Sequence, residues 1–148
     1  MTRWTIACVA GLVALSAVPG RAEDWAKTKA PDFYIGPGLE MDLEKDETDL
    51  TISVSLAGRH KLGPDIGLYD GKLLLGARYM VLGTRADLDG SIYGGPTLFW
   101  YDEHIGGGVI VGRHLSPRVI LEAGYRATSD WDGQADLSVG YGFDRPWK

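Results

Sequence analysis

The chain has almost no cysteine, no long apolar run after its first residues, and a deficit of positive charge. Its single cysteine, Cys8, lies within an apolar N-terminal stretch and not at its end, so lipidation is disfavoured. Residues 23–148 contain no cysteine, which excludes a disulfide framework or a thiolate metal site there. The chain has 15 basic against 20 acidic residues. A nucleic-acid surface is therefore not expected, because phosphate binding needs the opposite sign.

The first 22 residues have the three parts of a secretory signal peptide. Arg3 supplies a positive charge, residues 4–18 are uncharged and mostly apolar, and Gly20 and Ala22 are the small residues of a cleavage site. The apolar stretch is shorter than the roughly 20 residues that a membrane-spanning helix requires. We therefore predict a signal peptide at residues 1–22, cleavage after Ala22 and a single β-barrel domain at residues 23–148.

Apolar and polar residues alternate along much of the remaining chain. A period of two is typical of strands whose two faces meet different surroundings. Glycine is also abundant, with 21 residues in the chain, as expected for strands that bend or pack closely. Candidate strands lie at 33–44, 50–58, 64–69, 72–83, 91–101, 105–113, 118–126 and 134–143. Short turns join them, so we predict an all-β fold, an antiparallel up-and-down β-barrel of about eight strands, because closure removes both exposed edges.

Such a barrel can lie in water or in a membrane, and the two surroundings predict opposite faces. In water the apolar face points inward, whereas in a membrane it points to lipid and the polar face lines the interior. Trp100, Tyr125, Tyr141 and Phe143 fall near strand ends, where membrane barrels place aromatic residues. We expect a membrane-embedded barrel. A soluble periplasmic barrel that binds an apolar ligand is an alternative.

The C-terminal part of the chain shows a family resemblance. Residues 106–143 read GGGVIVGRHLSPRVILEAGYRATSDWDGQADLSVGYGF. A glycine-rich strand, an LSP-like turn, a strand ending in Tyr-Arg, a polar loop and an alternating strand ending in Gly-x-Phe follow in this order. This stretch resembles the last hairpin and closing strand of the OmpA-type family of eight-stranded outer-membrane barrels. The resemblance implies a porin-like protein of the Gram-negative outer membrane, with the barrel assembly machinery, membrane lipid and lipopolysaccharide as partners.

The turns expected on the outer side of such a barrel are rich in acidic residues. These acids are either simply solvated or hold divalent cations that bridge to lipopolysaccharide. They are Asp46, Glu47, Asp49, Asp70, Asp102, Glu103, Asp130 and Asp132.

Charged residues also fall on the face opposite the apolar set. An eight-stranded barrel is just wide enough for its own side chains, and a buried unpaired charge costs several kcal/mol. We therefore expect an inward ion-pair network that fills the lumen and leaves no open channel. Its expected members are the pair Glu122 and Arg78, the pair Arg126 and Asp136, and Glu40 and Asp42, with Arg118 on the same face. This predicts a non-enzymatic protein with an envelope-structural or surface-interaction role.

One catalytic alternative rests on His114, Ser116 and Glu122. A histidine, a serine and an acid can form an acyl-transfer triad, and the His-x-Ser pattern resembles that of outer-membrane lipid A deacylases. The intervening turn puts Glu122 about four residues along the neighbouring strand from His114, roughly 13 Å at about 3.3 Å per residue. That separation exceeds hydrogen-bond reach, so a lipid A acyl hydrolase using His114 and Ser116 remains the alternative hypothesis.

No metal or cofactor site is expected. The three histidines, His60, His104 and His114, fall in separate connections, with no carboxylate at zinc-ligand spacing. The glycine run at 106–108 is not a phosphate-binding loop, because no helix and no Lys-Ser or Lys-Thr pair follow it.

Overall fold

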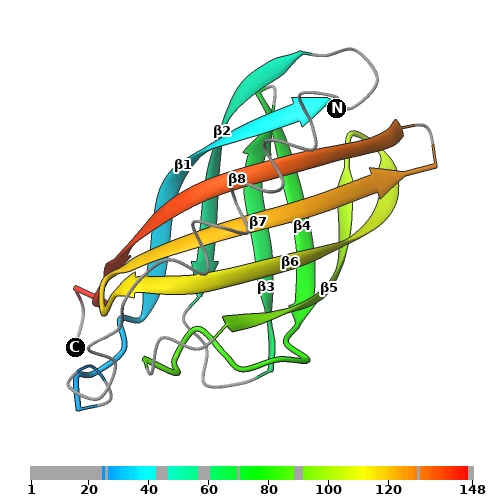
Figure 1. Ribbon diagram of the computed structural model, residues 1–148. Helices are drawn as coiled ribbons and strands as arrows, with labels where there is room; N and C mark the ends of the chain where they lie inside the picture. The colour runs from blue at the N-terminus through cyan, green and yellow to red at the C-terminus, as the bar shows by residue number, and fades with distance from the viewer. Residues whose placement is uncertain are drawn as a thin grey trace, which may run out of the picture.

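The protein is a closed barrel of eight antiparallel strands (Figure 1). The computed structural model describes residues 25, 27–42, 47–56, 61–69, 71–88, 92–129 and 131–146. The strands are β1 (Phe33–Asp42), β2 (Thr48–Leu56), β3 (Leu62–Tyr69), β4 (Lys72–Tyr79), β5 (Ile92–Tyr101), β6 (His104–Ser116), β7 (Val119–Thr128) and β8 (Trp131–Phe143). Each strand pairs with the next, and β8 pairs with β1. The predicted all-β up-and-down barrel is confirmed, whereas the expected signal peptide, residues 1–22, lies outside the described residues.

In the part of the chain that the structure describes, no helix is long and apolar enough to cross a membrane.

The two ends of the barrel can be told apart by their connections. β1 begins and β8 ends at the same end, where Phe33 opposes Phe143, and we call this the terminal end. β2, β4 and β6 also end there (Figure 1). β1, β3, β5 and β7 end at the opposite, distal end, where the tight turns after Tyr69 and Tyr101 lie.

The sequence located every strand but misplaced several strand ends. β6 and β8 are longer than predicted, because tight turns join them to their neighbours. The predicted strand 72–83 ends at Tyr79, and the chain leaves the ladder before Gly83, whose φ is 43°. The predicted strand ends at 43–44, 57–58 and 91 lie outside the described residues.

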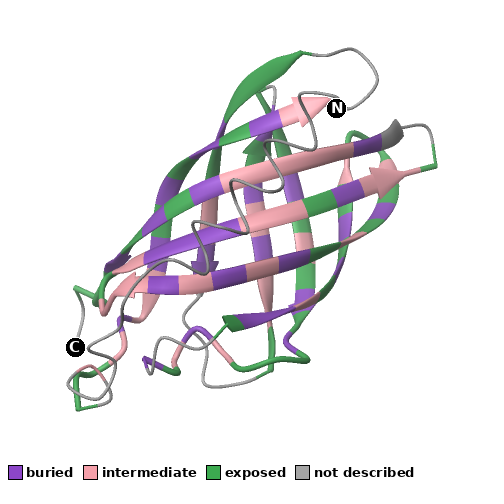
Figure 2. Cartoon of the chain, in the orientation of Figure 1, coloured by how far each residue is buried: buried purple, intermediate pink, exposed green. Residues whose placement is uncertain are grey.

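Buried and exposed residues alternate along the strands of the barrel (Figure 2). Along β1, Tyr34 and Glu40 are buried, whereas Ile35 and Leu39 are exposed. Large apolar side chains are exposed on the outside of all the strands, among them Ile35, Leu39, Ile52, Leu68, Leu73, Leu75, Leu98, Val109, Tyr125 and Val139. The barrel thus presents its apolar face outward and buries charged residues, the reverse of a barrel that encloses an apolar core in water.

Two inward-facing glycines explain how large side chains fit into the narrow lumen. A Cβ at Gly112 would lie 2.6 Å from the Tyr93 ring. A Cβ at Gly124 would overlap the carboxylate of Asp136. The glycine-rich strands β6 and β7 therefore leave space for aromatic and charged groups from neighbouring strands.

Candidate functional site: the charged lumen

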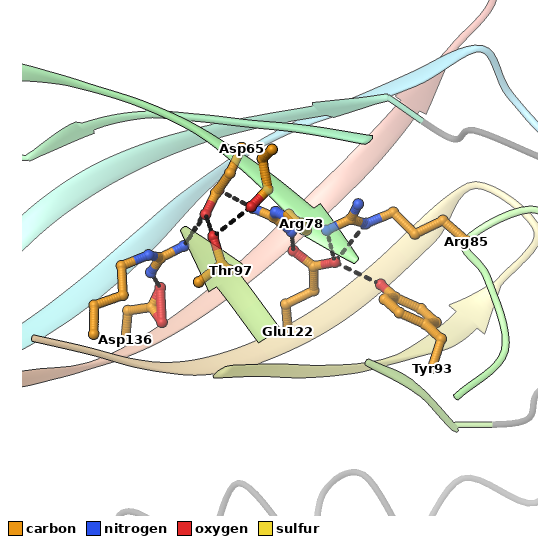
Figure 3. A network of polar contacts seen from close by, with 9 residues as sticks. Asp65, Arg78, Arg85, Tyr93, Thr97, Glu122 and Asp136 are labelled. Atoms are coloured by element: carbon orange, nitrogen blue, oxygen red, sulfur yellow. Dashed lines mark hydrogen bonds and ion pairs between the residues drawn. The ribbon is translucent and has the colours of Figure 1, made fainter. Parts of the chain in front are cut away.

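Glu122 on β7 is the centre of a buried ion cluster (Figure 3). Arg78 on β4 donates from Nη1 to Glu122 Oε2 at 3.2 Å. Arg85 donates from Nε to Glu122 Oε1 at 2.6 Å, and Tyr93 on β5 donates its hydroxyl to the same oxygen at 2.8 Å. Both carboxylate oxygens are therefore engaged, and one carboxylate faces two guanidinium groups.

Asp65 on β3 is a second centre, and Arg78 joins it to the first. Arg78 Nη2 bonds Asp65 Oδ1, and Thr97 Oγ1 donates to Asp65 Oδ2 at 2.6 Å. Arg126 Nη2 lies 3.4 Å from both oxygens of Asp65, and Arg126 Nη1 bonds Asp136. The side chains of Arg78 and Asp65 are each 1% exposed. The network therefore runs continuously from Arg85 to Asp136 within the barrel.

Charge is balanced within this network. Three guanidinium groups, those of Arg78, Arg85 and Arg126, contact three carboxylates, those of Asp65, Glu122 and Asp136. Burying charges is tolerated when each one is paired and hydrogen-bonded. The structure thus brings together both pairs expected from the sequence, Glu122 with Arg78 and Arg126 with Asp136.

Arg85 reaches the network from the β4–β5 connection. This connection turns at Thr84, whose backbone nitrogen and Oγ1 donate to Asp87 Oδ2 at 2.7 and 3.0 Å. Arg85 and Leu88 are both buried, and the Arg85 guanidinium lies 5.5 Å from the centre of the Tyr93 ring. The connection therefore sends the Arg85 side chain into the terminal end of the barrel, which the sequence did not predict.

Aromatic and apolar side chains lie on both sides of the ion network. Toward the distal end, Tyr69, Leu74 and Phe99 form one buried cluster. Toward the terminal end, Tyr93 packs with Met80 and Ile110 in another. These clusters help to fill the lumen on the distal and terminal sides of the ion network.

Glu40 does not join the ion pairs as expected. It is 5% exposed and faces inward, but within the described residues its carboxylate forms no hydrogen bond or ion pair. Its cross-strand neighbours are Asp136 on β8 and Asp49 on β2. Asp42 lies two residues further along the same face of β1, opposite Gln134.

His114 and Ser116 have separate surroundings. His114 is fully buried, and its Nε2 lies 3.0 Å from the Tyr34 hydroxyl oxygen. Ser116 ends β6, and its Oγ accepts a hydrogen bond from the backbone nitrogen of Arg118 at 3.3 Å. A shift in register after His114 places it opposite Ile120.

The separation of His114 from Glu122 is smaller than the sequence suggested. Because His114 opposes Ile120, Glu122 lies two residues along β7, not four. The predicted strand ended at residue 113, whereas β6 continues through Ser116 and the turn is correspondingly shorter. The Glu122 carboxylate nevertheless accepts hydrogen bonds from Arg78, Arg85 and Tyr93, so it does not orient His114.

Arg118 lies in the β6–β7 turn and not in the lumen, so its expected inward position is wrong. Its Nη2 donates to Asp144 Oδ2 at 2.8 Å, and its Nη1 donates to the backbone oxygen of Gly142 at 3.1 Å. The hydrogen bond from Arg118 lowers the pKa of Asp144 below its usual value. This exposed pair joins the end of β8 to the neighbouring turn.

Sequence reasoning missed Asp65, Arg85, Tyr93 and Thr97. Asp65 could have been recognised, because it is an acidic residue within a predicted strand and shares a face with Gly67, two residues further on. Arg85 carried no such signal, since its side chain enters the lumen from outside the strands. Among the described residues, no group of three or more His, Cys, Asp or Glu side chains is placed to hold a metal ion.

The chain matches no protein-family model, and comparisons with curated proteins and with solved structures found no match.

Proposed function

We propose that this protein is an outer-membrane β-barrel with a closed, charged lumen and an envelope-structural or surface-interaction role. The observation that carries the proposal is the apolar outer surface. Leu98 on β5, Val109 on β6 and Val139 on β8 are 64%, 53% and 44% exposed. Soluble monomers rarely expose large contiguous apolar patches, whereas the lipid-facing side of a membrane barrel consists of them.

The interior supports the same proposal and disfavours a soluble ligand-binding barrel. An apolar ligand would need an apolar lumen, but the centre of this one holds the ion network around Asp65 and Glu122. Displacing those pairs would leave buried charges uncompensated, at a cost of several kcal/mol. The ion network in the lumen therefore stabilises the barrel and obstructs a channel.

The catalytic alternative finds less support. A lipid A acyl hydrolase would need His114 to activate Ser116 at a lipid-accessible surface. His114 is instead buried beside Tyr34, and the Ser116 hydroxyl bonds the turn that follows it. We therefore keep the non-enzymatic role as the proposal.

The acidic residues at the distal end suggest how the barrel is oriented in the membrane. We place the terminal end in the periplasm and the distal end, with Glu47, Asp49, Asp102 and Glu103, at the cell surface. Lipopolysaccharide and divalent cations would then meet the acidic end. The proposed OmpA-type relationship and dependence on the barrel assembly machinery agree with this arrangement.

Cell fractionation and gel migration test the proposal together. We expect the protein in the outer-membrane fraction, with a shift in migration on detergent gels between unheated and boiled samples. Planar-bilayer recordings should show no steady conductance. Recovery as a soluble periplasmic monomer would overturn membrane embedding, whereas sizeable steady conductance would overturn the closed lumen alone. Lipid A that changes in mass with the intact protein but not with Ser116→Ala would instead support the enzyme.

A further inference from the structure

Hydrogen-bond acceptors without donors gather on the lumen wall where β1 pairs with β8, near the distal end. Glu40 is only 5% exposed, and its carboxylate has no hydrogen-bond or ion-pair partner within the described residues. Asp136 Oδ1 and Gln134 Oε1 are also buried and receive no hydrogen bond there. Glu40 and Asp136 are directly opposite in register, and Gln134 follows two residues along the same face of β8. The three acceptors therefore form one patch.

This patch also has an excess of negative charge. Asp49, Glu40 and Asp136 lie side by side across β2, β1 and β8, and like charges directly opposite one another are destabilising. The nearby positive group is Arg126, which is shared between Asp136 and Asp65. The charge of Arg126 also acts on Glu40, but this one guanidinium is already engaged with two other carboxylates.

An acceptor-rich, negative patch needs a positively charged donor. The described residues form no preformed cage for a metal ion, so an inner-sphere metal site is not the best fit. A primary ammonium group offers three N–H donors and no acceptor, which matches the three unpaired acceptors. Asp42, which is half-buried, lies two residues beyond Glu40 on β1, and Asp49, directly opposite Glu40 on β2, is exposed. A row of acids from the interior to the rim suits a chain of several positive charges.

We propose that this patch binds a linear polyamine, with one terminal ammonium group held by Glu40, Gln134 and Asp136. Asp49 then faces the remaining positive charges. The site shares Asp136 with the ion network but uses its other carboxylate oxygen, Oδ1, so the Arg126–Asp136 pair that helps to close the lumen can stay in place.

Calorimetric titration of the folded protein in detergent micelles with spermidine tests the proposal. We expect saturable binding of one spermidine per barrel. Glu40→Gln should weaken binding at least about tenfold, because the amide keeps an acceptor oxygen but loses the negative charge that strengthens the hydrogen bond. Gln134→Leu, which leaves the charge unchanged, should weaken binding by about threefold to tenfold. Glu103→Gln is the matched control, since it removes an exposed acid at the same end and should leave the affinity within about twofold.

Three results would overturn the proposal. The first is no saturable binding by the unmodified protein. The second is an equal loss of affinity in Glu40→Gln and Glu103→Gln, which would indicate only diffuse attraction to an acidic rim. The third is stoichiometric binding of Mg²⁺ at concentrations where spermidine does not bind. A heat-shift gel checks the fold of each variant, and Gln134→Leu keeps the test decisive if Glu40→Gln fails to fold.

Discussion

Removing the Glu122 carboxylate should reveal how the lumen network stabilises the barrel. In Glu122→Ala, Arg78 keeps its contact with Asp65, but among the described residues Arg85 retains only its contacts with Tyr93. Arg85 is 3% exposed, so its charge would be buried without a carboxylate partner. Breaking a buried ion pair from one side typically costs about 3–5 kcal/mol, and we expect that loss in the free energy of unfolding.

A double-mutant cycle separates this effect from lost packing. Arg85→Met alone leaves Glu122 paired with Arg78, so we expect it to cost less than Glu122→Ala. In the double variant the buried charge is gone, and a coupling free energy of at least about 2 kcal/mol should appear. The exposed Lys72→Met should instead add to Glu122→Ala within about 0.5 kcal/mol. Urea unfolding in lipid vesicles, followed by tryptophan fluorescence, gives these values, and an additive Glu122–Arg85 cycle would refute the reasoning.

Other predictions concern the barrel wall and its turns. A Cβ at Gly36 would overlap the backbone carbonyl of Val139, whereas Gly63 has open space around it. Urea unfolding should therefore show Gly36→Ala destabilised by about 1–3 kcal/mol and Gly63→Ala neutral or slightly stabilised; equal effects would be contradictory. Glu103 has a φ of 71°, so Glu103→Gly should stabilise the β5–β6 turn by about 0.5–1 kcal/mol, and a loss in the same assay would disprove strain there. In vesicles, Val139→Lys should cost about 2–4 kcal/mol and Leu50→Lys, near a strand end, about 0–1 kcal/mol, and the reverse order would count against lipid contact.

The barrel could be predicted from the sequence because the patterns that determine it are local. Alternation of period two defined each strand and its faces, and short turns required neighbouring strands to pair. The least regular predicted strand contained Pro64 and Gly67, yet β3 lies in the ladder between β2 and β4. Strand ends were less predictable, because they depend on turn geometry that sequence patterns define poorly.

The charged lumen could be predicted only in part. Arg126 and Asp136 lie on adjacent strands joined by one turn, so their pairing followed from strand direction. The contact of Arg78 with Glu122 crosses the barrel. It was predicted because both residues lie at a similar depth along their strands. Arg85 could not be placed, because no periodicity describes a connection that folds into the barrel. The isolation of Glu40 was also missed, since charge balance depends on which carboxylates share each arginine.

Contact between the exposed apolar side chains and lipid, as proposed, can be measured directly. Because residues 23–148 contain no cysteine, single cysteines can be introduced there and spin-labelled in protein that lacks the predicted signal peptide. Labels at Leu98, Val109 and Val139 in vesicles should be accessible to lipid-soluble oxygen and shielded from a water-soluble nickel chelate. A label at the exposed turn residue Glu103 should show the opposite preference. Ready access of the nickel chelate to all three outward positions, as at Glu103, would contradict the account.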